Sequence, residues 1–330
     1  MPSPDDTKGS PARPSRPLAR RNVSILSPLR YPGGKKRLAG YIAAAIRLNR
    51  LRPKLFVEPF AGGASVALQL LNDGLVERIA LGEKDPLLAS FWKTVFTDHE
   101  WLVRALRETE PTLANWDRFK RGSHRDDRSR ALACVFLNRT SFSGIIAPGS
   151  GPLGGRAQTS AYGLGCRYSV ETLARRIRQA AALSDRVLFI NHGDWRHTVR
   201  RVKARKFGQG DVLYYFDPPF YYKAEKLYRF FFDSSEHRRL HDALGGLGQH
   251  WLLSYDAAQP IIKMYGDNGI GPKRVELLYS AANSEKPAEM QELIVTNLSK
   301  LPSASRLWRT ADEWRSYRRL SERDGGDRGR

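Results

Sequence analysis

Short apolar runs alternate with amphipathic stretches along most of the chain, and this alternation predicts its secondary structure. The apolar run Leu55 to Glu58 is expected to form a buried strand, and Ala64 to Asn72 has the apolar spacing of a helix. A strand at Arg78 to Gly82 and a helix at Pro86 to Phe96 repeat the same order. The chain therefore begins with a βαβα unit.

The second half continues this pattern. Further strands are predicted at 186–191, 211–216, 250–255, 274–279 and 292–297, with a helix at about 234–247. Such alternation favours a largely parallel sheet that carries helices on both faces and binds ligands at the C-terminal ends of its strands. The expected fold class is a doubly wound, Rossmann-like α/β fold.

One internal segment and both ends of the chain depart from the pattern. Residues 98–184 lack the alternation and are rich in Gly, Ser and Arg, so we expect an inserted, mainly helical domain between two parts of the sheet, 25–97 and 185–300. Residues 1–24 carry five prolines and scattered arginines without apolar periodicity, which predicts a disordered basic arm. Residues 301–330 are expected to form a basic C-terminal tail.

The charge balance indicates a polyanionic partner. Fifty-five Lys and Arg against thirty-four Asp and Glu give a net charge of +21. Residues 101–210 hold 21 basic and 8 acidic side chains, so 13 of these charges lie in one third of the chain. Nucleic acid is favoured over a membrane because no apolar stretch is long enough to span one. The alternative is a solvated basic surface without a partner.

Cysteine and histidine usage argues against a metal centre. Cys134 and Cys166 are too few for a disulfide framework or a zinc site, and they fit a reducing compartment. His192 and His197 lack partners at metal spacing. We therefore expect no metal. The N-terminus lacks the apolar core of a signal peptide, so we expect a cytoplasmic protein.

A glycine turn and an acidic strand end suggest a nucleoside-like ligand. The sequence EPFAGGAS follows the strand at 55–58, and its glycines would let a ligand approach the backbone, although such a turn alone is weak support. The next strand ends at Gly82-Glu83-Lys84-Asp85, where Glu83 or Asp85 could accept from ribose hydroxyls. For Asp85 we prefer a helix N-cap, because Pro86 follows it.

The strongest signal is the stretch DVLYYFDPPF, an apolar strand that ends in Asp217-Pro218-Pro219-Phe220. Two prolines fix the backbone and remove two donors, so the turn is stiff and its carbonyl groups can accept hydrogen bonds. The Asp217 carboxylate and the Pro218 carbonyl could accept both hydrogens of an amine and direct its lone pair at an electrophilic methyl. Phe220 offers a ring on which a base could stack.

These motifs resemble the Dam-type family of adenine-N6 DNA methyltransferases over about residues 26–300. The resemblance implies an S-adenosylmethionine-dependent methyltransferase fold, with catalysis by Asp217, Pro218, Pro219 and Phe220. YPGGK resembles a cofactor motif of the family, and EPFAGGAS, GEKDP and HGDW resemble three others. They imply S-adenosylmethionine contacts from Tyr31, Gly33, Lys35, Glu58, Pro59, Phe60, Gly62, Gly63, Glu83, Asp194 and Asp217.

The resemblance also implies double-stranded DNA as the partner and residues 98–184 as the target-recognition domain. FLNRTSFSG is similar to the stretch that opens this domain in the family, which implies DNA contacts from Asn138, Arg139, Thr140 and Ser141. After Gly144 the sequence departs from the family, so no GATC target follows. The tetrapeptide ends in Phe where the family more often has Tyr, which keeps the stacking ring. A monomer is expected, and a cognate restriction endonuclease is left open as a partner.

Other functions remain to be separated from adenine methylation in DNA. Within enzymes the alternative is methylation of the cytosine N4 amine, or of adenine in RNA. Outside enzymes it is a non-catalytic DNA-binding relative, against which the complete set Tyr31, Glu58, Glu83, Asp194 and Asp217 argues. Zinc-dependent deamination is excluded because no Pro-Cys-x-x-Cys segment occurs. The arginine-rich stretch 196–206 fits a solvated helix face and a phosphate contact equally well.

Overall fold

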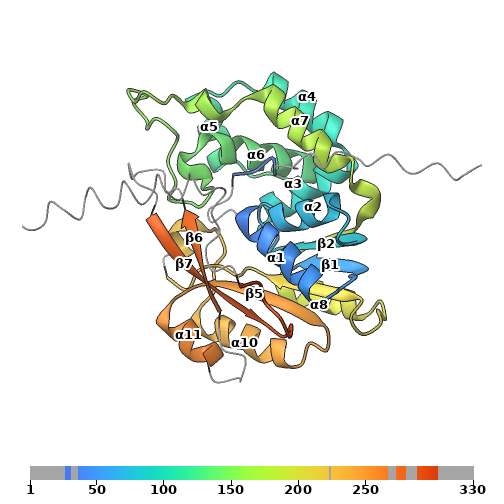
Figure 1. The fold of residues 1–330 in the computed structure, drawn as a ribbon. Coiled ribbons are helices and arrows are strands. Elements are labelled where there is room, and N and C mark those ends of the chain that lie inside the picture. The colour runs from blue at the N-terminus through green and yellow to red at the C-terminus, as the bar shows by residue number, and fades with distance from the viewer. Residues whose placement is uncertain (1–26, 31–35, 223, 267–272, 280–287, 304–330) are drawn as a thin grey trace, which may run out of the picture.

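The computed structural model describes residues 27–30, 36–222, 224–266, 273–279 and 288–303. Its centre is a sheet of seven strands in the order β3-β2-β1-β4-β5-β7-β6 (Figure 1). The strands are β1 (Leu55–Glu58), β2 (Arg78–Glu83), β3 (Val187–His192), β4 (Val212–Phe216), β5 (His250–Asp256), β6 (Lys273–Tyr279) and β7 (Ala288–Thr296).

The sheet is parallel from β3 to β5 and antiparallel at its other edge. β1 pairs in parallel with both β2 and β4, and β4 pairs in parallel with β5. β7 runs antiparallel to β5 and to β6, so the sheet ends in a hairpin. This topology confirms the predicted, largely parallel sheet and the positions of all seven predicted strands within a few residues. The disordered arm predicted for 1–24 and most of the tail predicted for 301–330 lie outside the described residues.

Alternating side chains of the strands enter two hydrophobic clusters, one on each face of the sheet. In β1, Phe56 belongs to one cluster, whereas Leu55 and Val57 belong to the other. In β4, Tyr215 and Tyr214 divide in the same way. Side chains of a strand point to opposite faces in turn, so each strand residue helps to fix helices on one side.

Helices cover both faces. The first cluster is shared with α1 (Lys36–Leu48), α2 (Ser65–Asn72) and α3 (Pro86–Thr97), and the second with α8 (Trp195–Lys203), α10 (Ser234–Gly245) and α11 (Gln259–Gly266). The predicted helices appear as α2, α3 and α10. α1 was not predicted, although its apolar residues Leu38, Tyr41, Ile42, Ala45 and Ile46 follow helical spacing and are buried.

The segment 98–184 is helical, as predicted, and forms the layer at the top of Figure 1. It contains α4 (His99–Glu108), α5 (Leu113–Arg121), α6 (Asp127–Thr140), α7 (Val170–Ala181) and the short 3-10 turns η1 (Phe142–Gly144) and η2 (Leu164–Arg167), with η3 (Ser184–Arg186) after it. α6 packs against α3, and Val135 and Phe136 of α6 join the same cluster as Phe91 and Trp92 of α3. The hydrophobic core therefore continues from the sheet into this layer.

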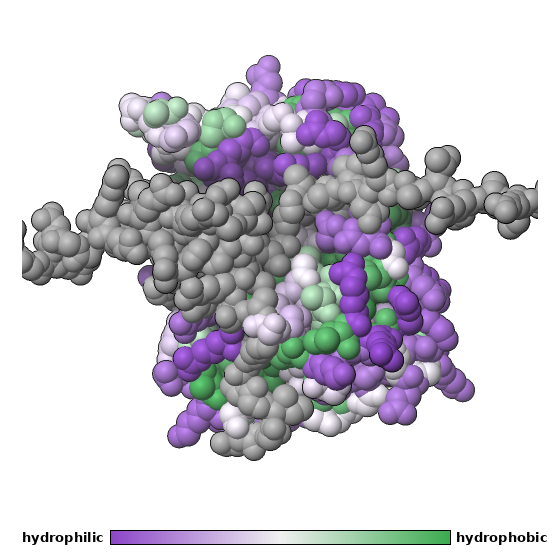
Figure 2. All heavy atoms as spheres, in the orientation of Figure 1, coloured by the Kyte–Doolittle hydropathy of each residue, from purple (hydrophilic) through white to green (hydrophobic). Residues whose placement is uncertain are grey.

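The surface of this layer is polar. Hydrophilic side chains dominate the upper layer on the face that Figure 2 shows. Trp92 and Trp116 are buried, and Trp101 packs against the hydrophobic core. None of the helices within the described ranges is long and apolar enough to cross a membrane.

Candidate active site

The predicted catalytic and cofactor motifs meet at the C-terminal ends of three neighbouring strands. β1 delivers Glu58, β4 leads into Asp217, and β2 ends at Glu83. Because β1 lies between β2 and β4, these three carboxyl groups reach one edge of the sheet. All three line one pocket, together with Phe60, Gly62, Gly63 and Pro219 of the predicted site.

A glycine turn forms one wall of this pocket. Gly62 and Ala64 have positive φ values of 45° and 47°, a backbone conformation that is costly for alanine and free for glycine. The turn is anchored from two sides. The Ala61 N–H donates to the Gly82 carbonyl at 2.9 Å, and the indole N–H of buried Trp92 donates to the Gly62 carbonyl at 2.8 Å.

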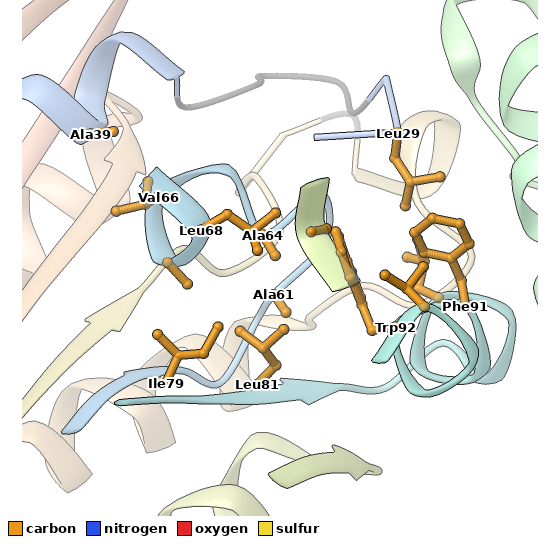
Figure 3. Close-up of a cluster of buried hydrophobic side chains, with 14 of the residues drawn as sticks. Leu29, Ala39, Ala61, Ala64, Val66, Leu68, Ile79, Leu81, Phe91 and Trp92 are labelled. Carbon is orange, nitrogen blue, oxygen red and sulfur yellow. The ribbon is translucent and has the colours of Figure 1, made fainter. Parts of the chain in front are cut away.

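Hydrophobic packing supports the same turn from below. Ala61 and Ala64 of the turn, Leu81 of β2 and Trp92 of α3 belong to one buried cluster (Figure 3). Leu29, which precedes α1, joins them. Since interiors are close-packed, a shift of the turn would disturb several neighbours at once, and the ligand-facing backbone is held rigid.

Glu83 supports the turn as well as lining the pocket. Its carboxylate accepts the Gly62 N–H at 2.9 Å through Oε2 and the Asp85 N–H at 3.0 Å through Oε1. Burial raises the pKa of Glu83 to about 7, although the two backbone donors oppose this shift. Glu83 therefore ties the end of β2 to the turn that follows β1.

Glu58 is the most deeply buried carboxyl group of the pocket, with 3 % of the residue exposed. Its Oε1 accepts the Ala67 N–H of α2 at 3.0 Å, whereas its Oε2 is buried and has no hydrogen-bond partner. Burial raises the pKa of Glu58 well above its ordinary value, and the nearby Asp217 carboxylate adds to this effect. A buried acceptor without a donor is an expected place for a ligand group that carries N–H.

Asp217 is held by residues that the sequence did not single out. The Ser254 hydroxyl of β5 donates to Asp217 Oδ1 at 2.7 Å, and the Tyr215 hydroxyl lies 2.8 Å from Ser254 Oγ. Ser254 and Tyr215 are both buried. The chain beyond the tetrapeptide is fixed in a similar way, because the Tyr221 N–H donates to Asp256 Oδ1 at 2.9 Å.

The tetrapeptide divides into pocket-lining and packed residues. Asp217 and Pro219 line the pocket, whereas Pro218 and Phe220 are buried and are not among its lining residues. The Phe220 ring packs edge-on against Tyr228, with centroids 6.0 Å apart. In this arrangement Phe220 supports the pocket wall, so its predicted role as a stacking face stays a prediction.

An aromatic segment that follows the tetrapeptide forms the opposite wall. Tyr228, Phe230, Phe231 and Phe232 line the pocket, and none of them was predicted. Arg229, within this segment, pairs with the buried Asp85 at 2.8 Å. Asp85 also accepts the Leu87 N–H as the N-cap of α3, which confirms the predicted capping role. The ion pair connects the aromatic wall to the end of β2.

Asp194 occupies a different position from the one expected of a pocket residue. It caps α8 by accepting the Arg196 N–H at 2.9 Å, and the Arg196 side chain pairs with it at 2.7 Å. Burial acts against ionisation, but the hydrogen bonds from Arg196 lower the pKa of Asp194. Asp194 and Pro59 are not among the pocket-lining residues. The Gly193 N–H donates to the Glu83 carbonyl at 2.8 Å, so the loop before Asp194 borders the site.

The residues predicted to touch DNA are buried in the structure. Asn138, Arg139, Thr140 and Ser141 are each at most 7 % exposed. Asn138 accepts the Arg30 N–H at 2.7 Å and donates to the Arg30 carbonyl at 2.6 Å. Thr140 donates to the Phe136 carbonyl, and Ser141 accepts from the Trp116 indole. Asn138 and Ser141 thus connect separate segments of the chain, whereas Thr140 bonds within α6. Residue type alone could not separate these roles from DNA contact.

Three further predictions remain to be compared with the structure. Tyr31, Gly33 and Lys35 lie outside the described residues. Most of the arginine-rich stretch forms α8. The guanidinium groups of Arg201 in this helix and of Arg205 just after it lie 4.2 and 4.9 Å from the Phe189 ring centroid. Among the described residues, no group of His, Cys, Asp and Glu has the arrangement of a metal site. Cys134 and Cys166 are free thiols.

The fold and the pocket together define a Rossmann-like enzyme with an acidic ligand site at its strand ends. The model of the D12 class N6 adenine-specific DNA methyltransferase family matches residues 31–280. The chain therefore belongs to this family and is an enzyme that methylates the N6 amine of adenine in DNA. This match confirms the family and the reaction that the sequence motifs implied. The comparison with curated proteins gave no match.

Proposed function

We propose that the pocket binds S-adenosylmethionine and that the chain methylates a flipped-out adenine of double-stranded DNA at the mouth of this pocket. When bound, S-adenosylmethionine supplies a methyl group that its sulfonium already activates. The protein then has to bind the two reactants, orient them in line and exclude water. The orphaned Glu58 Oε2 is the single observation that carries the proposal.

The residues of the pocket fit such a ligand. Glu58 offers a buried acceptor to an ammonium group, and a cation beside it would favour the carboxylate form that burial disfavours. Glu83 offers carboxylate oxygens to hydroxyl groups while its backbone partners hold it in place. The glycine turn leaves room for a ligand to lie against the backbone between them.

Asp217 is proposed to receive the adenine amine. Its Oδ1 is oriented by Ser254, and the rigid Pro218-Pro219 pair fixes the carbonyl groups beside it. Asp217 and the Pro218 carbonyl would each accept one hydrogen of the adenine amine. The lone pair of the amine nitrogen would then point toward the methyl group. Because a base inside a duplex cannot reach this strand-end pocket, its access requires extrusion from the helix.

The test compares Asp217→Ala with the exposed control Asp185→Ala. The variants are incubated with duplex DNA and S-adenosylmethionine, and the DNA is digested to nucleosides and analysed by mass spectrometry. Wild type and Asp185→Ala should produce N6-methyladenine, whereas Asp217→Ala should produce none and still bind DNA. N4-methylcytosine without N6-methyladenine, or full activity of Asp217→Ala, would refute the proposal.

A second arm addresses Glu58 and the cofactor directly. Isothermal calorimetry with S-adenosylmethionine should show at least tenfold weaker binding for Glu58→Gln than for wild type, because the amide presents N–H where an acceptor is needed. Glu110→Gln, an exposed change of the same type, serves as the control. Equal affinity for Glu58→Gln would remove Glu58 from the binding site.

A further inference from the structure

Four arginines from separate parts of the chain form a cluster beside the helical layer. Arg30 precedes α1, Arg139 lies at the end of α6, Arg167 ends η2, and Arg176 lies in α7. Burial lowers the pKa of Arg139 to about 10, and repulsion from Arg176, Arg30 and Arg167 adds to this shift. The fold also brings their segments together, because α6 packs against η2 and the Asn138 side chain of α6 bonds the Arg30 backbone. We refer to the four arginines as the arginine cluster.

Specific contacts hold the cluster in place. The Asn138 side chain makes two hydrogen bonds with the Arg30 backbone, and the Arg139 guanidinium donates to the Pro28 carbonyl. Tyr168, next to Arg167, packs its ring against Phe136 of α6 with centroids 5.4 Å apart. On α7, Leu173 and Ile177 enter the core on either side of Arg176. Like charges are thus brought together by the fold itself.

Several donors of the cluster have no acceptor. Arg139 Nε, Arg167 Nη1 and Arg176 Nε are buried without a hydrogen-bond partner, and Arg139 is only 7 % exposed. Within the described ranges, no carboxylate forms an ion pair with any of the four arginines. A buried guanidinium donor without an acceptor is costly, and a ligand that supplies oxygen atoms would remove this cost.

Other arginines of the helical layer differ from the cluster in this respect. Several are already neutralised by carboxylates at the surface, namely Arg107 by Glu171, Arg128 by Asp98, Arg156 by Asp117 and Arg178 by Glu100. The layer therefore pairs part of its positive charge internally, whereas the arginine cluster has no ion pair among the residues that the structure describes. Guanidinium groups with free buried donors are suited to a tetrahedral oxyanion, because each presents a planar fork of donors.

We propose that the arginine cluster binds a phosphate group, and that in the working enzyme this group is a backbone phosphate of the DNA substrate. The proposal rests on the proposed function for its choice of DNA as the source of the phosphate. It assigns the positioning of DNA to arginines contributed by α6, η2, α7 and the segment before α1. The buried Asn138, Thr140 and Ser141 then act as supports of the site.

The first experiment tests the anion site without DNA. Thermal unfolding of wild type, Arg167→Gln and Arg176→Gln is followed in phosphate-free buffer and with increasing inorganic phosphate at constant ionic strength. Phosphate should raise the Tm of wild type, because an anion that binds only the folded protein stabilises it. The increase should be smaller in each variant and absent in the double variant. Arg78→Gln, an exposed change at the start of β2, should respond like wild type.

The second experiment tests DNA as the source of the phosphate. Binding of a duplex is measured from low to high salt, and the slope of log K against log salt should decrease in magnitude by about one in Arg167→Gln and Arg176→Gln. Arg139→Lys, which keeps the charge but loses the fork, should weaken binding with a nearly unchanged slope. Arg78→Gln should match wild type in affinity and slope.

The outcomes separate the two proposals. The arginine-cluster site would be overturned if the Arg167→Gln, Arg176→Gln double variant matched wild type in two measurements. These are the rise of Tm with phosphate and the salt slope of DNA binding. A lost phosphate response with an unchanged DNA slope would overturn DNA as its ligand. Absence of methyl transfer by wild type would instead count against the proposed function, and the phosphate experiment would still decide whether the anion site exists.

Discussion

The Ser254 hydroxyl donates a hydrogen bond of 2.7 Å to Oδ1 of Asp217. Ser254 lies in β5, which pairs with the strand β4 that leads into Asp217, so the contact crosses between adjacent strands. Tyr215 approaches the same serine oxygen to 2.8 Å from within β4. The carboxylate that is proposed to receive adenine is thus oriented by a buried pair of hydroxyl groups.

Ser254→Ala should lower kcat about tenfold or more, because a hydrogen bond to a charged group contributes about 1.5–3 kcal/mol. The affinity for DNA should stay the same, since Ser254 is fully buried and touches no surface. Single-turnover methylation and DNA titration would measure both quantities. Tyr215→Phe keeps the Ser254–Asp217 hydrogen bond and should lower kcat less. An equal or larger decrease in kcat would contradict the proposal that Ser254 orients Asp217 directly.

Gly82→Ala should destabilise the protein by about 1–3 kcal/mol or more, because its β-carbon would lie 2.2 Å from Thr198 Oγ1 and 3.1 Å from the Pro59 carbonyl oxygen. Chemical denaturation would report the loss. Adding Thr198→Ala should restore part of the stability by removing the nearest atom. Gly40→Ala in α1 has open space around it and should be neutral or stabilising, which makes it the matched control.

The stability of the folded enzyme should depend on pH through Glu83. Its pKa is raised from 4.5 to about 7 in the folded state. The protonated Glu83 therefore contributes fully to the free energy of unfolding below pH 4.5, and this contribution is lost as pH rises through about 7. The corresponding loss of unfolding free energy is about 3 kcal/mol.

Denaturant titrations of wild type and Glu83→Gln at pH 5 and pH 8 would isolate this contribution. In wild type, the free energy of unfolding should fall between pH 5 and pH 8 by the amount that Glu83 contributes. In Glu83→Gln this part of the decrease should be missing. Glu110→Gln, which changes an exposed carboxyl group, should behave as wild type. The same pH dependence in wild type and Glu83→Gln would show that Glu83 does not carry it.

Arg229→Gln should weaken S-adenosylmethionine binding severalfold and lower stability by about 1–3 kcal/mol, because Asp85 would be left buried without its counter-ion. The aromatic wall that contains Arg229 would also lose its tie to β2. Calorimetry and thermal unfolding would measure the two effects. In the double variant with Asp85→Asn, which keeps an N-capping side chain, stability should recover; failure to recover would place the effect outside this ion pair.

The sequence predicted the strands well because buried runs and their turns are local signals. The expected strand ends also place Glu83 and Asp217 correctly at one edge of the sheet, whereas Glu58 was singled out only through the family resemblance. The sequence did not predict that β7 would run antiparallel to β5, because alternation of apolar residues is the same in both directions. The partners of Asp217 were missed for a related reason, since Ser254 becomes its neighbour only through strand pairing.

The polar residues at the end of α6 show what the sequence could not predict. Asn138 and Ser141 are polar, which at sequence level suits both DNA contact and internal capping, and the structure gives them internal partners. The aromatic wall was missed because its residues follow the tetrapeptide in a stretch without a repeating pattern. The Arg229–Asp85 ion pair and the ring contact between Phe220 and Tyr228 hold that stretch against the pocket, and both depend on the folded chain.

The neighbouring positions of β1 and β4 have a consequence for how this enzyme can change. The chain leaves β1 and returns to β4 only after the whole helical layer has been built, yet backbone hydrogen bonds hold the two strands in register. Lengthening or shortening the intervening chain alters its closure entropy only slowly and leaves that register intact. The helical layer can therefore change in sequence and length while the spacing between Glu58 and Asp217 is kept.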